Sequence, residues 1–204
     1  MIGAMRSFRK ARRITIALGD GRRAAYLTQV GARAPFKDLP EPSMTIQIGD
    51  RIPSATLSQG TPEGPKPVQT DEFFKGKTVA LFAVPGAFTP TCSARHLPGY
   101  VDNKAELKAK GVDVIACVSV NDAFVMNAWA ESQGLTGDDV VMLADGNGDF
   151  TRTVGLVLDG KGFGLGERSQ RYSMLVVDGV VTQLNIEQGG EFKVSSAEHL
   201  LAQL

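Results

Sequence analysis

The stretch from Val79 to Pro98 constrains the fold of this chain more than any other. It begins with an apolar run, Val79–Val84, which lies between Gly76 on one side and Pro85 on the other. A short apolar run bounded by glycine and proline is typical of a fully buried strand. A loop with two prolines follows and leads into a polar segment that contains Cys92. We therefore predict a strand–loop–helix unit with a cysteine where the loop meets the helix.

Cys92 is a candidate nucleophile because of its expected place in the first helical turn. Pro90 suits the start of a helix, and Thr91 can act as the N-cap. Free backbone N–H groups and the helix dipole favour a thiolate in that turn. A lone cysteine is more often a small buried hydrophobic residue. Here, however, the neighbours are polar and include Arg95, which predicts a partly open, electropositive site.

The segment Pro85–Cys92, Pro-Gly-Ala-Phe-Thr-Pro-Thr-Cys, resembles the Pro-x-x-x-Thr-x-x-Cys loop of the peroxiredoxins. It is most similar to the atypical type II, or peroxiredoxin-5-like, branch of that family. Two further segments, Val118–Trp129 and Arg168–Gly179, match in the expected order, and the resemblance covers Thr45 to Leu204. The resemblance implies a thioredoxin-like fold of the α/β class, with a central mixed β-sheet flanked by helices.

The resemblance assigns the catalytic chemistry to four residues. Cys92 supplies the thiolate, Thr89 places a hydroxyl near the sulfur, and Pro85 shields the sulfur from water. Arg171, at the start of a strand, offers a planar fork of donors that can hold the thiolate and a peroxide oxygen together. The alternative role for Thr89 is to cap a local turn. Arg168 is expected to be a surface charge.

The implied activity is reduction of hydrogen peroxide and organic hydroperoxides through a sulfenic acid on Cys92. Some members of this branch carry a resolving cysteine near the C-terminus, but the segment Gly190–Ser196 has none. Cys117 lies in an apolar run and is expected to be a core residue, with a resolving role as the alternative. We therefore expect an external reductant, either glutathione with a glutaredoxin or thioredoxin. A homodimer is also implied, and no metal or prosthetic group is expected.

Charge is unevenly distributed along the 204 residues, although the formal net charge is zero. Residues 1–43 hold nine of the 22 basic residues and three of the 22 acidic ones, a balance of +6 that leaves −6 for residues 44–204. We therefore divide the chain into a basic, disordered N-terminal extension and one peroxiredoxin-like domain. The alternatives for residues 1–43 are a targeting peptide and an upstream stretch outside the natural protein.

The same composition limits the partners and the location of the protein. The acidic domain offers no basic surface for nucleic acid, and no apolar run reaches the length of a membrane span. Two cysteines without a secretory signal argue for a reducing compartment. We expect a cytoplasmic protein, or a mitochondrial one if residues 1–43 are a transit peptide.

Strands and helices alternate along the rest of the domain, after a turn at Gly60–Pro67. Asp122 can cap one helix, Ser196 can cap the last one, and Asp178-Gly179 is a strong signal for a two-residue hairpin. The expected helices are 70–76, 92–110 with an interruption at Pro98-Gly99, 123–132, a short stretch after 149, and 197–204. The expected strands are 112–120, 140–144, 172–177 and 180–186.

Two other functions remain as alternatives. A Cys–His hydrolase would pair Cys92 with His96, four residues later on the same helix face. No nearby acid clearly orients His96, which is expected at the helix surface or in an interface. A redox sensor of thioredoxin-like fold would be oxidised at Cys92 slowly and without turnover. Asp145–Asp149 superficially resembles a calcium loop but lacks its alternating ligands, so a turn is expected there.

Overall fold

The computed structural model describes residues 45–136 and 138–204, so the predictions for residues 1–43 lie outside it. No helix in these two ranges is both long and apolar enough to cross a membrane. Their strands are β1 (Thr56–Thr61), β2 (Gly64–Gln69), β3 (Thr78–Ala83), β4 (Val114–Ser119), β5 (Val141–Ala144), β6 (Val157–Asp159), β7 (Glu167–Ser169), β8 (Tyr172–Val177) and β9 (Val180–Ile186). Their helices are α1 (Thr70–Phe74), the π-helical turn η1 (Cys92–His96), α2 (Leu97–Asp102), α3 (Lys104–Ala109), α4 (Ala123–Ser132), α5 (Asp149–Thr153), the 3₁₀ turn η2 (Lys161–Phe163) and α6 (Ala197–Leu201).

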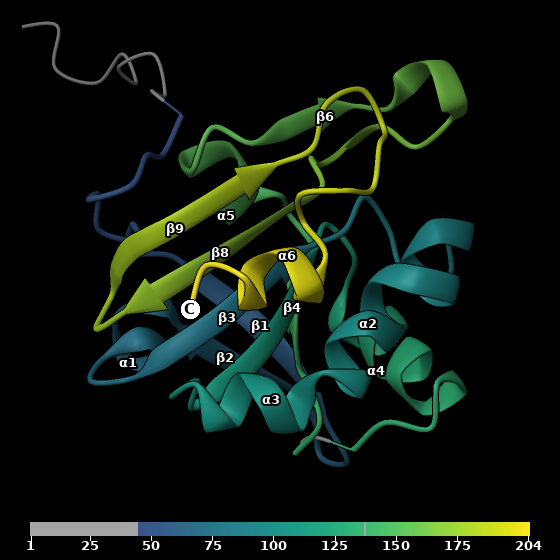
Figure 1. Cartoon of the computed structure of the whole chain (residues 1–204). Coiled ribbons are helices and arrows are strands. Elements are labelled where there is room, and N and C mark those ends of the chain that lie inside the picture. The colour runs from purple at the N-terminus through teal and green to yellow at the C-terminus, as the bar shows by residue number, and fades with distance from the viewer. Residues whose placement is uncertain (1–44, 137) are drawn as a thin grey trace, which may run out of the picture. The chain divides into compact units, whose positions relative to one another are not determined.

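Seven strands form one mixed sheet in the order β2-β1-β5-β4-β3-β8-β9 (Figure 1). Strands β3, β4 and β5 are parallel, whereas β1 pairs antiparallel with β5 and β8 pairs antiparallel with β3. Parallel neighbours need crossover connections, and helices supply them here. The predicted α/β, thioredoxin-like fold with a central mixed sheet flanked by helices is confirmed.

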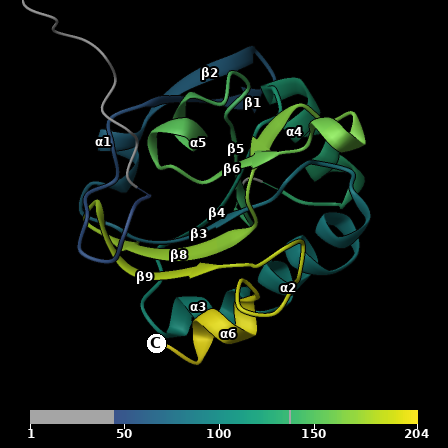
Figure 2. The ribbon, with the colours of Figure 1, turned by 90° about the horizontal axis from the view of Figure 1, so that it is seen from above.

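Alternate side chains of β3 point to opposite faces of the sheet and enter two separate cores. Phe82 belongs to the core on the side of α2, α3, α4 and α6. Leu81 belongs to the core on the side of α1 and α5. Figure 2 shows α2, α3 and α6 along one face and α5 on the other. Because both faces are covered, the strand is a continuous apolar run rather than an alternating one.

The cap and turn signals in the sequence are confirmed at three places. Asp178 and Gly179 have positive φ angles of 48° and 77°, as a two-residue turn between β8 and β9 requires. Asp122 accepts a backbone N–H in the first turn of α4, and Ser196 does the same for α6. The hairpin and the Ser196 cap lie at the two ends of the segment that consists of β9 and residues 187–195.

The turn predicted at Gly60–Pro67 is shorter than expected. Strand β1 continues to Thr61 and β2 begins at Gly64, so Pro65 and Pro67 lie within a strand. The strand tolerates them because β2 is at the edge of the sheet, where proline need not donate to a neighbour.

A second, two-stranded sheet of β6 and β7 is absent from the sequence predictions. Each of these strands has only three residues, too few to show an alternating pattern. The connection between them is rich in glycine. Gly160 is required there, since a Cβ would lie 2.9 Å from the carbonyl oxygen of Gly166.

The helix predicted after Cys92 is interrupted, as expected from Pro98. Pro98 has no N–H for the carbonyl of Ala94, and its ring crowds that carbonyl. The preceding turn is widened: the N–H of Leu97 donates to the carbonyl of Cys92, five residues back. Residues Cys92–His96 therefore form a π-helical turn, a geometry often found at functional sites.

Candidate active site

Strand β4 and the residues directly after it hold the segment that leads into Cys92. The N–H of Val84 donates to a carbonyl of β4 at 3.1 Å, and the N–H of Ala87 donates to the side chain of Asn121 at 3.0 Å. The Arg168 guanidinium donates to a backbone carbonyl directly after β4 at 2.8 Å. Arg168 therefore joins loops together, and the prediction that it is only a surface charge is wrong.

The helical segment begins at Pro90, two residues before the predicted start at Cys92, and Cys92 lies in its first turn. The prediction that Thr91 caps this helix is wrong. Thr91 has helical φ and ψ angles of −66° and −37°, and its side chain makes no capping hydrogen bond. The carbonyl of Thr89 accepts the N–H of Ser93 at 3.0 Å, so Thr89 stands just outside the first turn.

Cys92 is completely buried, with a guanidinium beside its sulfur. Nη2 of Arg171, the residue before β8, donates to Sγ of Cys92 at 3.5 Å. A cationic donor in that position favours a thiolate. The predicted electropositive surroundings are therefore present, but the site is not partly open as expected, because no part of Cys92 is exposed.

His96 contacts the same guanidinium from the other end of the π-helical turn. Its Nδ1 lies 3.0 Å from Nη1 of Arg171, and its Nε2 lies 3.0 Å from the carbonyl oxygen of Ser195. A guanidinium only donates and a carbonyl only accepts, so Nδ1 accepts while Nε2 carries the proton. Burial, reinforced by the charge of Arg171, lowers the pKa of His96 to about 3. The imidazole is therefore neutral at ordinary pH.

These contacts correct the prediction that His96 lies at the helix surface or in an interface, because the residue has no exposed surface. They also argue against the Cys–His hydrolase. Both ring nitrogens are engaged with Arg171 and Ser195, so neither is placed to take a proton from Cys92.

Thr89 and Pro85 lie on the loop that precedes Cys92. The Thr89 hydroxyl donates to the carbonyl of Gly86 at 2.9 Å, which is the turn-capping role considered as the alternative. Its single proton is used in this way, so its lone pairs remain available to accept hydrogen bonds. Pro85 is half-buried and, with Arg171, lines a cavity of about 240 Å³ bounded also by residues 157–159, 170 and 187–190.

Cys117 is completely buried in β4, in the same core as Cys92. Its strand neighbours are Phe82 in β3 and Met142 in β5. Burial raises the pKa of the Cys117 thiol well above its usual value, and nearby Cys92 adds to the effect. A buried, protonated thiol is unreactive, which fits the predicted core role.

The segment after β9 packs against the arginine and the histidine. The ring of Phe192 lies 5.0 Å from that of His96, and its centroid is 5.8 Å from Cζ of Arg171. The carbonyl of Ser195 accepts hydrogen bonds from His96 and from the hydroxyl of Tyr100, the latter at 3.1 Å. This arrangement was not predicted from the sequence. The two hydrogen bonds of the His96 ring join residues 75 and 99 positions apart, and only the four-residue spacing of Cys92 and His96 indicated that they share a helix face.

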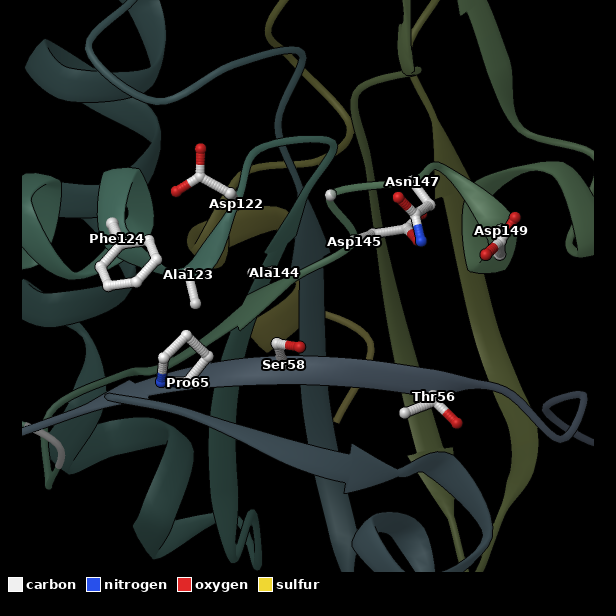
Figure 3. A pocket seen from close by; sticks show the side chains of 11 residues that line it. Thr56, Ser58, Pro65, Asp122, Ala123, Phe124, Ala144, Asp145, Asn147 and Asp149 are labelled. Atoms are coloured by element: carbon white, nitrogen blue, oxygen red, sulfur yellow. The ribbon is translucent and has the colours of Figure 1, made fainter. Parts of the chain in front are cut away.

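A separate pocket lies where the end of β5 meets the start of α4 (Figure 3). Its three carboxylates are already engaged within the chain. Asp122 caps α4, Asp145 accepts two N–H groups of α5 at 2.8 and 3.1 Å, and Asp149 pairs with Arg152 at 2.8 Å. Within residues 45–136 and 138–204, no group of three histidine, cysteine or acidic side chains is arranged to hold a metal ion.

Comparison with known proteins gives consistent matches over most of the chain. Residues 47–201 match the family model described as Redoxin. Peroxiredoxin-2E-2, chloroplastic, from Oryza sativa subsp. japonica is 56% identical over 164 residues, covering 78% of this chain and 73% of that protein. The hybrid peroxiredoxin hyPrx5 from Haemophilus influenzae is 45% identical over 166 residues, covering 79% and 67%. The crystal structure of reduced Prx3 in complex with H₂O₂ from Vibrio vulnificus has a TM-score of 0.74 and 56% identity, covering 78% of this chain and 99% of that one.

Proposed function

Because the chain belongs to the peroxiredoxin family, in its type II or peroxiredoxin-5-like branch, and is a thiol-dependent peroxidase, we propose that Cys92 is the thiol that reduces the peroxide. The buried contact of 3.5 Å between Nη2 of Arg171 and Sγ of Cys92 carries this proposal. A fixed guanidinium stabilises the thiolate before the reaction and the negative charge that develops on the departing oxygen.

In the proposed reaction, the thiolate of Cys92 attacks one oxygen of the peroxide. The S–O bond forms as the O–O bond breaks, the sulfur gives up two electrons, and water or an alcohol leaves after taking up a proton. A sulfenic acid remains on Cys92. One external thiol then condenses with it to a mixed disulfide and releases water, and a second thiol reduces that disulfide.

Thr89 and Pro85 complete the proposed site. The Thr89 hydroxyl already donates to the carbonyl of Gly86, so its oxygen is the acceptor for the O–H of the incoming peroxide. Pro85 forms one wall of the cavity beside Arg171 and keeps bulk water from the sulfur.

The proposed substrates are hydrogen peroxide and organic hydroperoxides with small alkyl groups. Val157 and Leu158 supply an apolar wall of the cavity that suits an alkyl group. The proposed reductant is glutathione with a glutaredoxin, or thioredoxin. Cys117 has no part in the cycle, because it is buried between two paired strands and kept protonated. By removing peroxides in this way, the protein would serve in antioxidant defence and cell redox homeostasis.

Intact mass after addition of one equivalent of hydrogen peroxide tests this proposal. Wild type is expected to gain one oxygen, Cys92→Ser none, and Cys117→Ser one oxygen followed by turnover with glutathione. A loss of two hydrogens would show that Cys117 resolves the sulfenic acid internally. Oxidation of Cys92 without repeated turnover in either reductant system would favour the redox sensor.

We also propose that the protein is a homodimer. Four large apolar side chains are exposed, two on loops (Phe88 at 55% and Leu165 at 37%), one in the first turn of α4 (Phe124 at 69%) and one in η2 (Phe163 at 86%). Arg168 donates to the carbonyl of Val120, before α4, and to that of Leu165, so it connects the segments that carry three of them. An exposed apolar surface of this kind is typical of an interface between chains.

Sedimentation velocity tests the dimer. Phe124→Ser combined with Phe163→Ser is expected to give monomers. Ile48→Ser, at an apolar residue that is 60% exposed in another part of the fold, is expected to leave the dimer intact. A monomeric wild type at micromolar concentration would contradict the proposal.

For residues 1–43 we propose an extension that takes no part in catalysis, with residues 44–204 as the peroxidase domain. We propose a cytoplasmic location, with import into an organelle as the alternative if residues 1–43 are a transit peptide. The relatives from rice and Arabidopsis that are named chloroplastic support the alternative. Imaging of fluorescent fusions with and without residues 1–43 distinguishes the two, since only a transit peptide changes the location.

A further inference from the structure

Glu187 is a buried carboxylate that the proposed reaction does not use. It is 7% exposed, and no cation lies within ion-pair distance of it among the described residues. One of its oxygens, Oε1, accepts hydrogen bonds from the N–H of Lys193 at 2.6 Å, the N–H of Ser195 at 2.8 Å and the hydroxyl of Ser195 at 2.9 Å. Burial acts to raise the pKa of Glu187, but the hydrogen bonds from Ser195 and Lys193 outweigh it and lower the pKa overall.

Glu187 is also the cross-strand neighbour of the active-site arginine. Its N–H donates to the carbonyl of Arg171 at 3.0 Å, which extends the β8–β9 pairing by one residue beyond Tyr172 and Ile186. Both side chains line the same cavity. The carboxylate nevertheless turns to its own loop rather than to the guanidinium.

Through Ser195, the carboxylate is connected to the reacting sulfur by an unbroken series of contacts. Glu187 holds the N–H and hydroxyl of Ser195, and the carbonyl of Ser195 accepts from Nε2 of His96. Nδ1 of His96 accepts from Nη1 of Arg171 at 3.0 Å, and Nη2 of Arg171 donates to Cys92 at 3.5 Å. Each donor in the series has one acceptor, so the direction of every bond is fixed.

We propose that Glu187 is a positioning residue for the active-site arginine. By fixing the loop 187–195 it sets the place of the Ser195 carbonyl, which fixes the ring of His96 and thereby aims Arg171 at Cys92. This inference rests on the proposed function, since it concerns how the thiolate of that site is stabilised.

An indirect link suits this task better than an ion pair. A carboxylate in direct contact with Arg171 would neutralise the guanidinium and compete with the thiolate for its donors. A neutral imidazole orients the guanidinium and leaves its charge for the sulfur and the peroxide. The negative charge of Glu187 stays where three donors stabilise it.

Phe192 gives the loop a second contact with the same groups. Its ring lies against His96, and the guanidinium carbons of Arg95 and Arg171 lie 4.8 and 5.8 Å from its centroid. A change at Glu187 that releases the loop therefore removes both the carbonyl that fixes the imidazole and the ring that covers it.

The test compares Glu187→Ala and Glu187→Gln with Glu191→Ala in the Cys117→Ser background. Glu191 is a matched control, because it is on the same loop but is exposed and pairs at the surface with Lys193. The readouts are the rate constant for oxidation by hydrogen peroxide and the pH profile of Cys92 alkylation by iodoacetamide. A residue with a merely structural role would lower the melting temperature without moving that profile.

Glu187→Ala is expected to slow oxidation roughly 10-fold or more and to shift the alkylation profile to higher pH, because the thiolate loses an aimed guanidinium. Glu187→Gln keeps one acceptor oxygen and should recover most of the rate, and Glu191→Ala should match wild type. If Glu187→Ala does not fold, Ser195→Ala removes one of the three bonds and should show a smaller shift in the same direction.

Unchanged rate and profile in the folded Glu187 and Ser195 variants would overturn the inference while leaving the peroxidase intact. A wild type in which peroxide adds no oxygen to Cys92 would instead contradict the proposed function. The two failures are therefore distinguishable.

Discussion

Arg171 divides its two terminal amino groups between the sulfur of Cys92 and the imidazole of His96. This division requires a planar fork, which a lysine cannot supply because its ammonium is a single point. The third nitrogen, Nε, is buried and has no hydrogen-bond partner within residues 45–136 and 138–204. The orientation of the guanidinium therefore depends on the two contacts that its amino groups make.

Arg171→Lys is expected to slow oxidation of Cys92 by roughly 100-fold, the usual cost of removing a donor aimed at developing charge. Stopped-flow measurement with hydrogen peroxide gives the rate constant. Arg51→Lys is the control, because Arg51 is exposed and, in the part of the chain that the structure describes, its side chain donates only to the carbonyl of Asp178. A lysine variant as fast as wild type would remove Arg171 from the reaction.

The pH dependence of folding should report the buried imidazole. Burial, and secondarily Arg171, lowers the pKa of His96 from 6.5 to about 3, so between these values the unfolded chain binds a proton that the native state does not. Stability should therefore fall as the pH drops below 6.5, by up to about 1.4 kcal/mol per pH unit from this residue. Urea unfolding at several pH values measures how the free energy of unfolding changes per pH unit, and this change should be smaller in His96→Gln. An equal change in wild type and variant would mean that His96 is charged in the folded protein.

At the scale of single residues, the sequence was enough to propose which residues take part in the reaction, but not which hydrogen bonds connect them. The motif Pro85–Cys92 led to Cys92, Thr89 and Pro85, and the matching segment Arg168–Gly179 led to Arg171. Such motifs specify residue types and spacing. The contacts of His96 depend instead on where a strand and a C-terminal loop arrive in space. No local pattern contains that information, and so His96 was predicted to lie at the helix surface or in an interface.

Among the helices and strands, the π-helical turn η1 has the most direct effect on the geometry of the proposed site. It places Cys92 and His96 at its two ends, both within reach of one guanidinium. The difference between an acceptor carbonyl four residues back and one five residues back is small, and it is decided by Pro98 and packing. The hairpin at Asp178-Gly179 was predictable because its geometry is set by those two residues alone.

Pro98→Ala should let the turn revert towards a regular α-helix. The new N–H can bond the carbonyl of Ala94, which rotates His96 relative to Cys92 and slows oxidation by peroxide. The fluorescence of Trp129, the only tryptophan, should change as well, since its Nε1 donates to Ser93 at 3.0 Å. Unchanged rate and unchanged fluorescence would show that the π-helical turn does not depend on Pro98.

Strand β1 and helix α4 pack closely enough to require a glycine between them. A Cβ at Gly60 would lie 2.8 Å from Cβ of Asn127 and 2.9 Å from the carbonyl of Ala123. Gly60→Ala should therefore cost about 1–3 kcal/mol in urea unfolding. Gly99→Ala, within α2 and with its nearest atom at 3.9 Å, should be neutral or slightly stabilising and serves as the control. Equal stability of both variants would contradict the close packing.

For the molecule as a whole, the contacts of the proposed site described above, all among residues 45–136 and 138–204, come from residues 84–195. A protein of residues 44–204 should therefore keep its melting temperature and its rate with peroxide within roughly two-fold of the full chain. Calorimetry and stopped-flow kinetics compare the two. A large loss in the shorter protein would show that residues 1–43 contribute to folding or catalysis.

The two prolines of β2 have a consequence for how copies of this protein meet. In the antiparallel pairing with β1, alternate residues of β2 turn their backbone nitrogen towards β1, and Pro65 and Pro67 occupy the intervening positions that face outward. The outer side of this strand therefore offers fewer donors than an incoming strand would need to extend the sheet. Pro65 and Pro67 therefore disfavour aggregation by strand addition at this edge of the sheet, because each lacks the N–H that an incoming strand would bond.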